Sequence, residues 1–202
     1  MIASSWLPGA LAGGVISLVV SLAFSFIQPR IRRWQLTRGL AVEIDPPHGP
    51  HARLRVANRG YWTVKDTIVY MALEFSADDV APPPDRGAFI TPELFVPMED
   101  EQLCWSVRSP TPNPIRVDIF ARERQPICPC LIEPDCILIP SEELGKEGKW
   151  RVSLHRREYH GQLKVVSADT DARYFSLVID PDNRSQPLGV RPLQRRESRE
   201  RV

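Results

Sequence analysis

Residues 53–75 read RLRVANRGYWTVKDTIVYMALEF, and this stretch decides the fold class of the chain. Apolar and charged residues alternate in Arg53–Val56, as they do along a strand with one buried face. The segment Asn58-Arg59-Gly60 then predicts a turn, because Asn and Gly tolerate the backbone angles of tight turns. In the following run, Thr67–Phe75, every second residue is apolar from Val69 onwards. The stretch therefore predicts two half-buried strands joined by a corner.

The string LRVANRGYWTVKDTIVYMALEF, from Leu54 to Phe75, resembles the strand, Asn-x-Gly corner and next strand of bacterial immunoglobulin-like sandwiches, including CARDB-type adhesion modules. The resemblance covers about a tenth of the chain and brings no catalytic residue with it. It implies an interaction or spacer module. CARDB-type modules are usually extracytoplasmic.

The chain contains 20 prolines, and further short strands separated by proline-rich turns are predicted along it. Residues 40–183 are expected to form an all-β, immunoglobulin-like antiparallel sandwich, with Trp150–Leu154 and Leu163–Ser167 paired as a hairpin. Residues 184–202 carry six Arg and two Glu and are expected to be a disordered tail. The remaining expected strands are Leu40–Ile44, Ala88–Val96, Leu103–Val107, Ile115–Ala121 and Tyr174–Ile179.

An apolar run precedes the sandwich, from Trp6 to Ile27: WLPGALAGGVISLVVSLAFSFI. Its 22 residues contain no charged side chain and no His, and as a helix they would extend roughly 33 Å, close to the thickness of a hydrocarbon core. The run predicts one N-terminal transmembrane helix over residues 6–28, after a short tail of residues 1–5. A cleaved signal peptide is the competing interpretation, but it requires a basic segment before the apolar run.

Four arginines without an acidic residue follow in the juxtamembrane segment 29–39: Arg30, Arg32, Arg33 and Arg38. By the positive-inside rule they predict an N-terminus outside the cell and a C-terminal domain in the cytoplasm, at the plasma (inner) membrane. The same side chains are expected to contact anionic headgroups of the lipid bilayer.

Small residues recur at every fourth position of the apolar run: Gly9, Gly13, Ser17, Ser21 and Ser25. Such a stripe lets two helices approach closely, and Gly9 and Gly13 satisfy the GxxxG pattern. It predicts a homodimer or docking on another membrane helix. The alternative is that the stripe meets only lipid, since Gly and Ser are frequent in membrane helices.

The leading candidates for metal-binding or redox residues are the four cysteines, Cys104, Cys128, Cys130 and Cys136. Four thiolates match a tetrahedral zinc site in number, but Cys128-Pro129-Cys130 places one residue between ligands where two to four are usual. Buried, reduced thiols are the preferred interpretation, and disulfides the alternative if the domain lies outside the cell. No cofactor other than this possible zinc ion is expected.

The net charge of the domain and the lack of catalytic motifs disfavour several classes of function. Residues 39–183 hold 16 basic and 23 acidic residues, a net charge of −7, which disfavours nucleic-acid binding. Neither a nucleophile elbow nor a glycine-rich phosphate loop is present, so no enzyme activity is expected. The sequence predicts a membrane-anchored interaction or scaffold protein with an unnamed protein partner. An extracytoplasmic adhesion or envelope-assembly module and a cysteine-based redox or zinc sensor are the alternatives.

Overall fold

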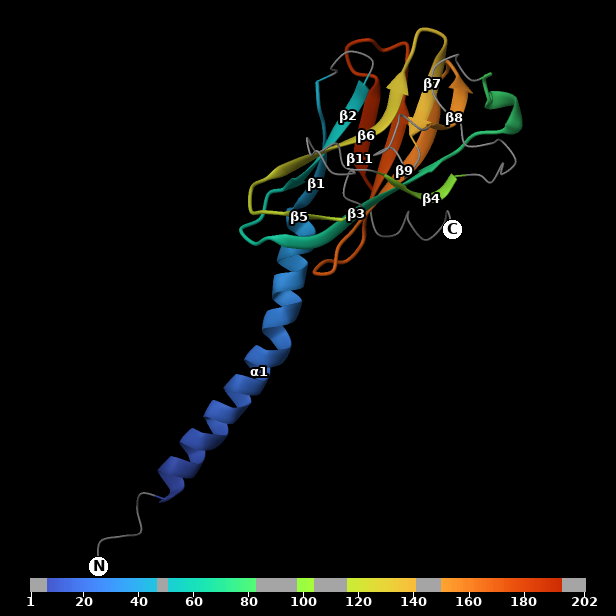
Figure 1. Cartoon of the computed structure of the whole chain (residues 1–202). Helices are drawn as coiled ribbons and strands as arrows, with labels where there is room; N and C mark the ends of the chain where they lie inside the picture. The colour runs from blue at the N-terminus through green and yellow to red at the C-terminus, as the bar shows by residue number, and fades with distance from the viewer. Residues whose placement is uncertain (1–6, 47–50, 83–97, 104–115, 141–149, 194–202) are drawn as a thin grey trace, which may run out of the picture.

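The computed structural model describes residues 7–46, 51–82, 98–103, 116–140 and 150–193. It consists of one long helix, α1, followed by two antiparallel sheets packed face to face (Figure 1). α1 leaves the sandwich at one end and projects away from it. The all-β antiparallel sandwich is thus confirmed, and it is compatible with an immunoglobulin-like fold.

α1 spans Leu7–Gly39 without a break at Pro29 and ends at Gly39. Within the part of the chain that the structure describes, no helix is long and apolar enough to cross a membrane. The prediction of a transmembrane helix over residues 6–28 is therefore wrong. The helix runs on through the four arginines, and its apolar stretch with placed side chains, Val15–Ile27, is shorter than the about 20 residues that a hydrocarbon core requires.

The first sheet has the strand order β1-β2-β6-β7-β8. Its strands are β1 (Leu40–Ile44), β2 (His51–Asn58), β6 (Arg124–Ile132), β7 (Cys136–Pro140) and β8 (Trp150–His155). Sequence reasoning missed β6, because its two prolines argue against a strand. The structure accommodates them because β7 pairs with β6 only at Leu131 and Ile132, which leaves the proline-containing part of β6 paired to β2 alone among the described strands.

The second sheet has the order β11-β10-β9-β3-β4, with β5 paired to the start of β3. Its strands are β3 (Val64–Leu73), β4 (Met98–Leu103), β5 (Val117–Ile119), β9 (Tyr159–Val166), β10 (Arg173–Ile179) and β11 (Leu188–Pro192). A short 3-10 helix, η1 (Ala77–Asp79), follows β3. β11 lies in the segment expected to be a disordered tail, so that expectation fails for residues 188–192.

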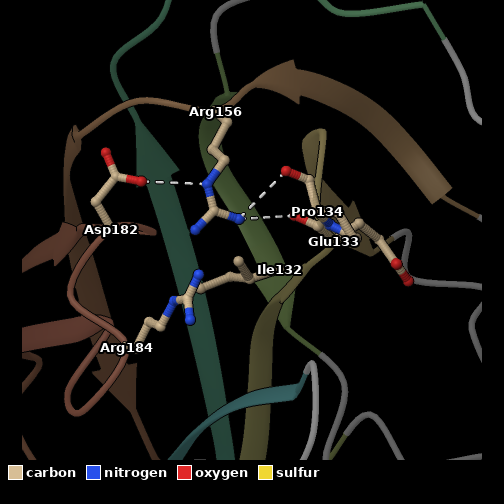
Figure 2. A pocket seen from close by; sticks show the side chains of 6 residues that line it. All are labelled: Ile132, Glu133, Pro134, Arg156, Asp182 and Arg184. Carbon is tan, nitrogen blue, oxygen red and sulfur yellow. Dashed lines mark hydrogen bonds and ion pairs between the residues drawn. The ribbon is translucent and has the colours of Figure 1, made fainter.

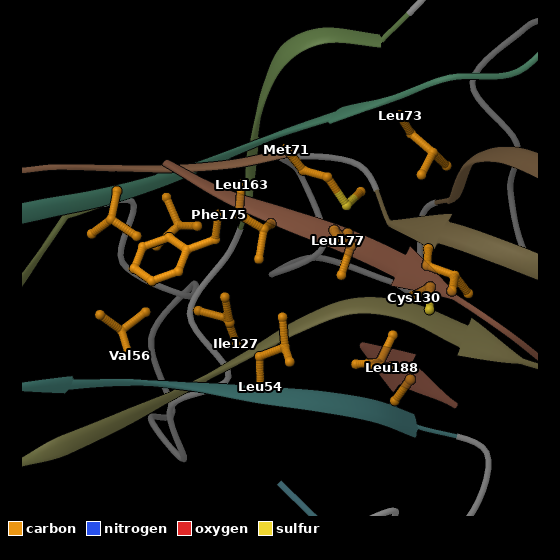
Figure 3. Close-up of a cluster of buried hydrophobic side chains, with 14 of the residues drawn as sticks. Leu54, Val56, Met71, Leu73, Ile127, Cys130, Leu163, Phe175, Leu177 and Leu188 are labelled. Atoms are coloured by element: carbon orange, nitrogen blue, oxygen red, sulfur yellow. The ribbon is translucent and has the colours of Figure 1, made fainter. Parts of the chain in front are cut away.

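The core lies between the two sheets and is built from the alternating residues that the sequence indicates (Figure 3). Leu54 and Val56 of β2 face Met71 and Leu163 of the opposite sheet, and all four are fully buried. The predicted inward residues of β3 and β10 are buried as well: Val69, Met71, Leu73, Phe175, Leu177 and Ile179. Burying such side chains contributes about 1.5–3 kcal/mol each relative to leaving them exposed.

One pairing prediction is wrong. β8 and β9 do not form a hairpin, since β8 pairs with β7 in the first sheet and β9 pairs with β3 and β10 in the second. The segment between them crosses from one layer to the other. The expected strand Ala88–Val96 and all of Leu103–Val107 except Leu103 lie outside the described residues.

Candidate interaction surface

A buried asparagine organises the end of the sandwich from which α1 projects. Asn58, at the end of β2, is 1% exposed. Its Nδ2 donates to the backbone oxygens of Trp62 (2.7 Å), Ile119 (3.0 Å) and Phe120 (3.1 Å), and its Oδ1 accepts from the Gly60 N–H (3.0 Å). Buried polar groups of the backbone need such partners. The Asn-x-Gly corner is therefore a clamp that ties the β2–β3 loop to the β5–β6 loop.

The C-terminus of α1 is joined to the same corner. The Arg59 N–H donates to the Gly39 carbonyl oxygen at 2.8 Å. A Cβ added at Gly39 would lie 3.0 Å from the Gly60 nitrogen, so glycine permits this close approach. The Arg173 guanidinium of β10 donates to the Leu40 carbonyl and to two carbonyls of the last helical turn. A cation at this position complements the helix C-terminus, although partial burial lowers the pKa of Arg173.

Side-chain contacts fix the last turns of α1 against the sandwich. Leu36 is buried and belongs to the main core. Arg33 Nε lies 2.9 Å from the Asp171 carboxylate, and the Asp171 N–H donates to Thr37 Oγ1 at 3.0 Å. The helix base, the corner and the β9–β10 loop therefore form one unit.

Large aromatic side chains on this unit face outward. Tyr61 is 78% exposed, Trp62 52% and Phe120 61%. The Arg32 guanidinium of α1 lies 5.3 Å from the Trp62 ring centroid, and that of Arg122 lies 5.2 Å from the Tyr61 ring centroid. These distances suit cation–π interactions. The arrangement presents broad apolar rings together with positive charge.

The helix base contributes a third such pair, since the Arg38 guanidinium lies 4.2 Å from the Trp34 ring centroid. We refer to the seven residues as the collar: Arg32, Trp34, Arg38, Tyr61, Trp62, Phe120 and Arg122. Sequence reasoning singled out Arg32 and Arg38 as headgroup contacts and missed the four residues on the loops. The adjacent letters Tyr61-Trp62, placed directly after a predicted turn, were the available signal.

Beyond the collar, α1 exposes apolar side chains on two opposite sides. The exposed positions include Leu18, Val20, Leu22, Phe24 and Phe26, of which Phe26 is 70% exposed. Successive even-numbered residues are rotated by about 200° around a helix, so this series occupies two opposite sides of it. Ser17, Ser21 and Ser25 are exposed between them, and Ser25 Oγ donates to the Ser21 carbonyl at 2.8 Å.

The predicted arginines do not act alike in the structure. Arg33 is engaged with Asp171, whereas Arg32 and Arg38 stack on rings of the collar. Arg30 is exposed and has no carboxylate partner among the described residues. Gly9 and Gly13 lie within α1. Helix association through the small-residue stripe stays a prediction, which cross-linking of a Gly13→Leu, Ser17→Leu variant measures.

Three of the cysteines lie in the first sheet, where Cys128 is half-buried. Cys130 and Cys136 are buried free thiols, and Cys128 Sγ donates to the Cys130 carbonyl at 3.3 Å. Desolvation raises the pKa of Cys128 to about 11 and raises the pKa of Cys130 as well, which disfavours the thiolate needed for metal binding or nucleophilic attack. Among residues with described placement, no three Cys, His, Asp or Glu side chains gather as metal ligands. Cys104 lies outside the described residues.

A cleft of about 750 Å³ opens at the other end of β6, lined by Ile132, Glu133, Pro134, Arg156, Asp182 and Arg184 (Figure 2). The Arg156 guanidinium donates to the Glu133 and Pro134 carbonyls, to the Pro181 carbonyl and to the Asp182 carboxylate (3.2 Å). Its donors are thus used to hold two loops together. Figure 2 shows no hydrogen bond or ion pair between the Arg184 side chain and the other residues that line the cleft. The cleft carries two cations and two carboxylates and favours neither sign of ligand.

The two ends of the sandwich therefore differ, since one closes on its own polar contacts and the other presents the collar. No family model, curated protein or solved structure matches the chain. The functional assignment consequently depends on the geometry of α1 and the collar.

Proposed function

We propose that this chain is a non-catalytic interaction module whose β-sandwich is held at a lipid surface by α1. The observation that carries the proposal is the set of apolar side chains exposed on two opposite sides of α1. Exposed apolar surface of this extent is typical of helices that contact lipid or another protein.

The junction supports a positioning role for the helix. α1 is fixed to the sandwich through the buried Leu36, the Arg33–Asp171 ion pair and the Arg173 contacts with its last carbonyls. A helix attached in this way transmits its position and orientation to the domain. A flexible linker would only limit the distance between them.

The sandwich itself supplies the interaction surface in this proposal. The immunoglobulin-like arrangement and the CARDB-like string support a module that binds another protein. The free thiols of Cys130 and Cys136 support a reducing compartment, so we assign the domain to the cytoplasmic face of the plasma membrane. An extracytoplasmic adhesion module is the alternative that the CARDB resemblance favours.

Flotation of the full chain with phosphatidylcholine vesicles tests the lipid contact. The wild type is expected to float with the vesicles. A variant with Leu22→Glu and Phe26→Glu loses two exposed apolar contacts, and its partitioning is expected to fall at least about a hundredfold.

Ser185→Glu with Gln186→Glu is the matched control, because both residues are exposed at the far end of the sandwich and the substitutions add the same two charges. This control should float like the wild type. If the wild type stays in solution with every vesicle preparation, the proposed function is wrong.

A further inference from the structure

The collar carries an inference about which surface the sandwich meets. Trp62 and Phe120 are held by backbone that the Asn58 clamp fixes from inside, so their exposure is imposed by the fold. Exposing three large rings costs solvation free energy, and a protein gains by covering them. The rings therefore indicate a partner at this end.

The cations of the collar indicate the chemistry of that partner. Arg32, Arg38 and Arg122 each stack on a ring, and none of them has a carboxylate partner among the described residues. Guanidinium groups bind phosphate through two parallel hydrogen bonds, and stacking on a ring leaves the outer edge of the group available for this.

Two of the acidic residues at the same end are paired with arginines outside the collar. Glu43 pairs with Arg59 and Arg124, and Asp171 pairs with Arg33. Glu123 accepts hydrogen bonds from the Phe120 N–H and the Gln125 amide. The charges of Glu43 and Asp171 are thus compensated locally, whereas Glu123, Asp118 and Asp169 accept hydrogen bonds from neutral N–H groups and keep their charge. The arginines of the collar form no ion pair with any of these carboxylates among the described residues.

The distance along α1 between its apolar segment and the collar favours a lipid surface over a protein as the partner. Ile27 ends the apolar part of the helix, and Trp34 of the collar lies about 10 Å further along the axis. Arg with Trp and Tyr at such a distance from an apolar segment matches the headgroup layer of a bilayer, where these side chains are enriched. A protein partner would not require this order of apolar, aromatic and cationic layers.

We propose that the collar docks the sandwich on the phosphate headgroups of an anionic lipid surface, with the rings of Tyr61, Trp62 and Phe120 at the headgroup boundary. This inference rests on the proposed lipid contact of α1 and adds a second contact, made by the loops of the sandwich. It sets the orientation of the domain on the surface. It also makes binding depend on headgroup charge.

The test compares Arg122→Gln with Arg184→Gln in the full chain. Both substitutions remove one positive charge from an exposed arginine, but Arg184 lies at the opposite end of β6 beside Ile132. Partitioning is measured on vesicles of phosphatidylcholine alone and of phosphatidylcholine with phosphatidylglycerol. Arg122→Gln is expected to lower binding to the anionic vesicles about fivefold, and Arg184→Gln to leave it unchanged. Thermal unfolding of both variants verifies that they are folded.

Each outcome is informative. Equal binding of the two variants overturns the docking of the collar while leaving the proposed contact of α1 intact, because the wild type still floats. Equal binding of the wild type to both vesicle types overturns the headgroup preference. If neither vesicle binds the wild type, the proposed function itself fails, and a cross-linked protein that contacts Trp62 would then assign the collar to a protein partner.

Discussion

The clamp at Asn58 leads to the sharpest prediction about stability. Asn58→Ala removes two N–H donors shared by three carbonyl oxygens and one acceptor used by the Gly60 N–H. At about 1 kcal/mol net for each of three hydrogen bonds, the free energy of unfolding is expected to fall by about 3 kcal/mol. The midpoint of thermal unfolding should then fall by about 6–12 °C.

Asn58→Asp is the informative companion. It keeps an oxygen for the Gly60 N–H but directs a carboxylate at the backbone oxygens of Trp62, Ile119 and Phe120. It should therefore destabilise at least as much as Asn58→Ala at neutral pH. Urea unfolding of the full chain in a mild detergent measures both variants. A loss under about 1 kcal/mol for Asn58→Ala, or near-native stability of Asn58→Asp, would refute the clamp.

Three further predictions concern the sandwich. Asp79 is buried, and its pKa is lowered by hydrogen bonds from Ser76 and then by the charge of Arg157. The stability that Asp79 contributes is therefore present above its unfolded pKa of about 4 and is lost as pH falls through the lower folded value. Acid unfolding of Asp79→Asn should lack this component, and identical acid unfolding of the variant and the wild type would contradict the prediction. Burial raises the pKa values of Cys128 and Cys130, so both thiols should react with maleimide far more slowly at neutral pH in the folded protein than in urea. Mass spectrometry quantifies the labelling at each site. Rapid labelling of the folded protein would contradict the prediction, because it would show that the thiols are accessible. Gly161→Ala would place a Cβ 2.4 Å from a β3 carbonyl oxygen and should lower the free energy of unfolding by more than about 2 kcal/mol. Gly189→Ala would place its Cβ 3.5 Å from the nearest side-chain atom and should change the midpoint of thermal unfolding little. Equal midpoints for the two variants would contradict the packing.

Local alternation made much of the sandwich predictable. In β2, β3 and β10 the period of two survives because each strand has one face in the core and one face outside it. The Asn-x-Gly corner was also recognised, although its clamp was not. Sequence shows that Asn58 begins a turn but not that its amide reaches carbonyls 61 and 62 residues further on.

Long-range pairing was the part that could not be predicted. β8 and β9 are adjacent in sequence and both alternate, yet they belong to different sheets, because their partners are set by β7 and β3. β6 was missed because its prolines suit a strand only where one side lacks a partner, which is a property of the assembled sheet. The transmembrane prediction failed on the extent and composition of the described helix.

The collar could not be predicted from the sequence either. Its members come from α1, the β2–β3 loop and the β5–β6 loop, and only the fold brings Arg32 next to Trp62. Single exposed aromatic residues carry little information in a sequence, whereas three of them around one helix base identify a surface.

Hydrogen exchange of the full chain with and without anionic vesicles measures directly whether α1 and the collar contact lipid. Vesicles are expected to slow exchange in α1 and in the loops 59–63 and 120–123, while the loops 133–135 and 180–186 at the far end keep their rates. Protection of the far loops, or no protection of the loops that carry the collar, would contradict this expectation.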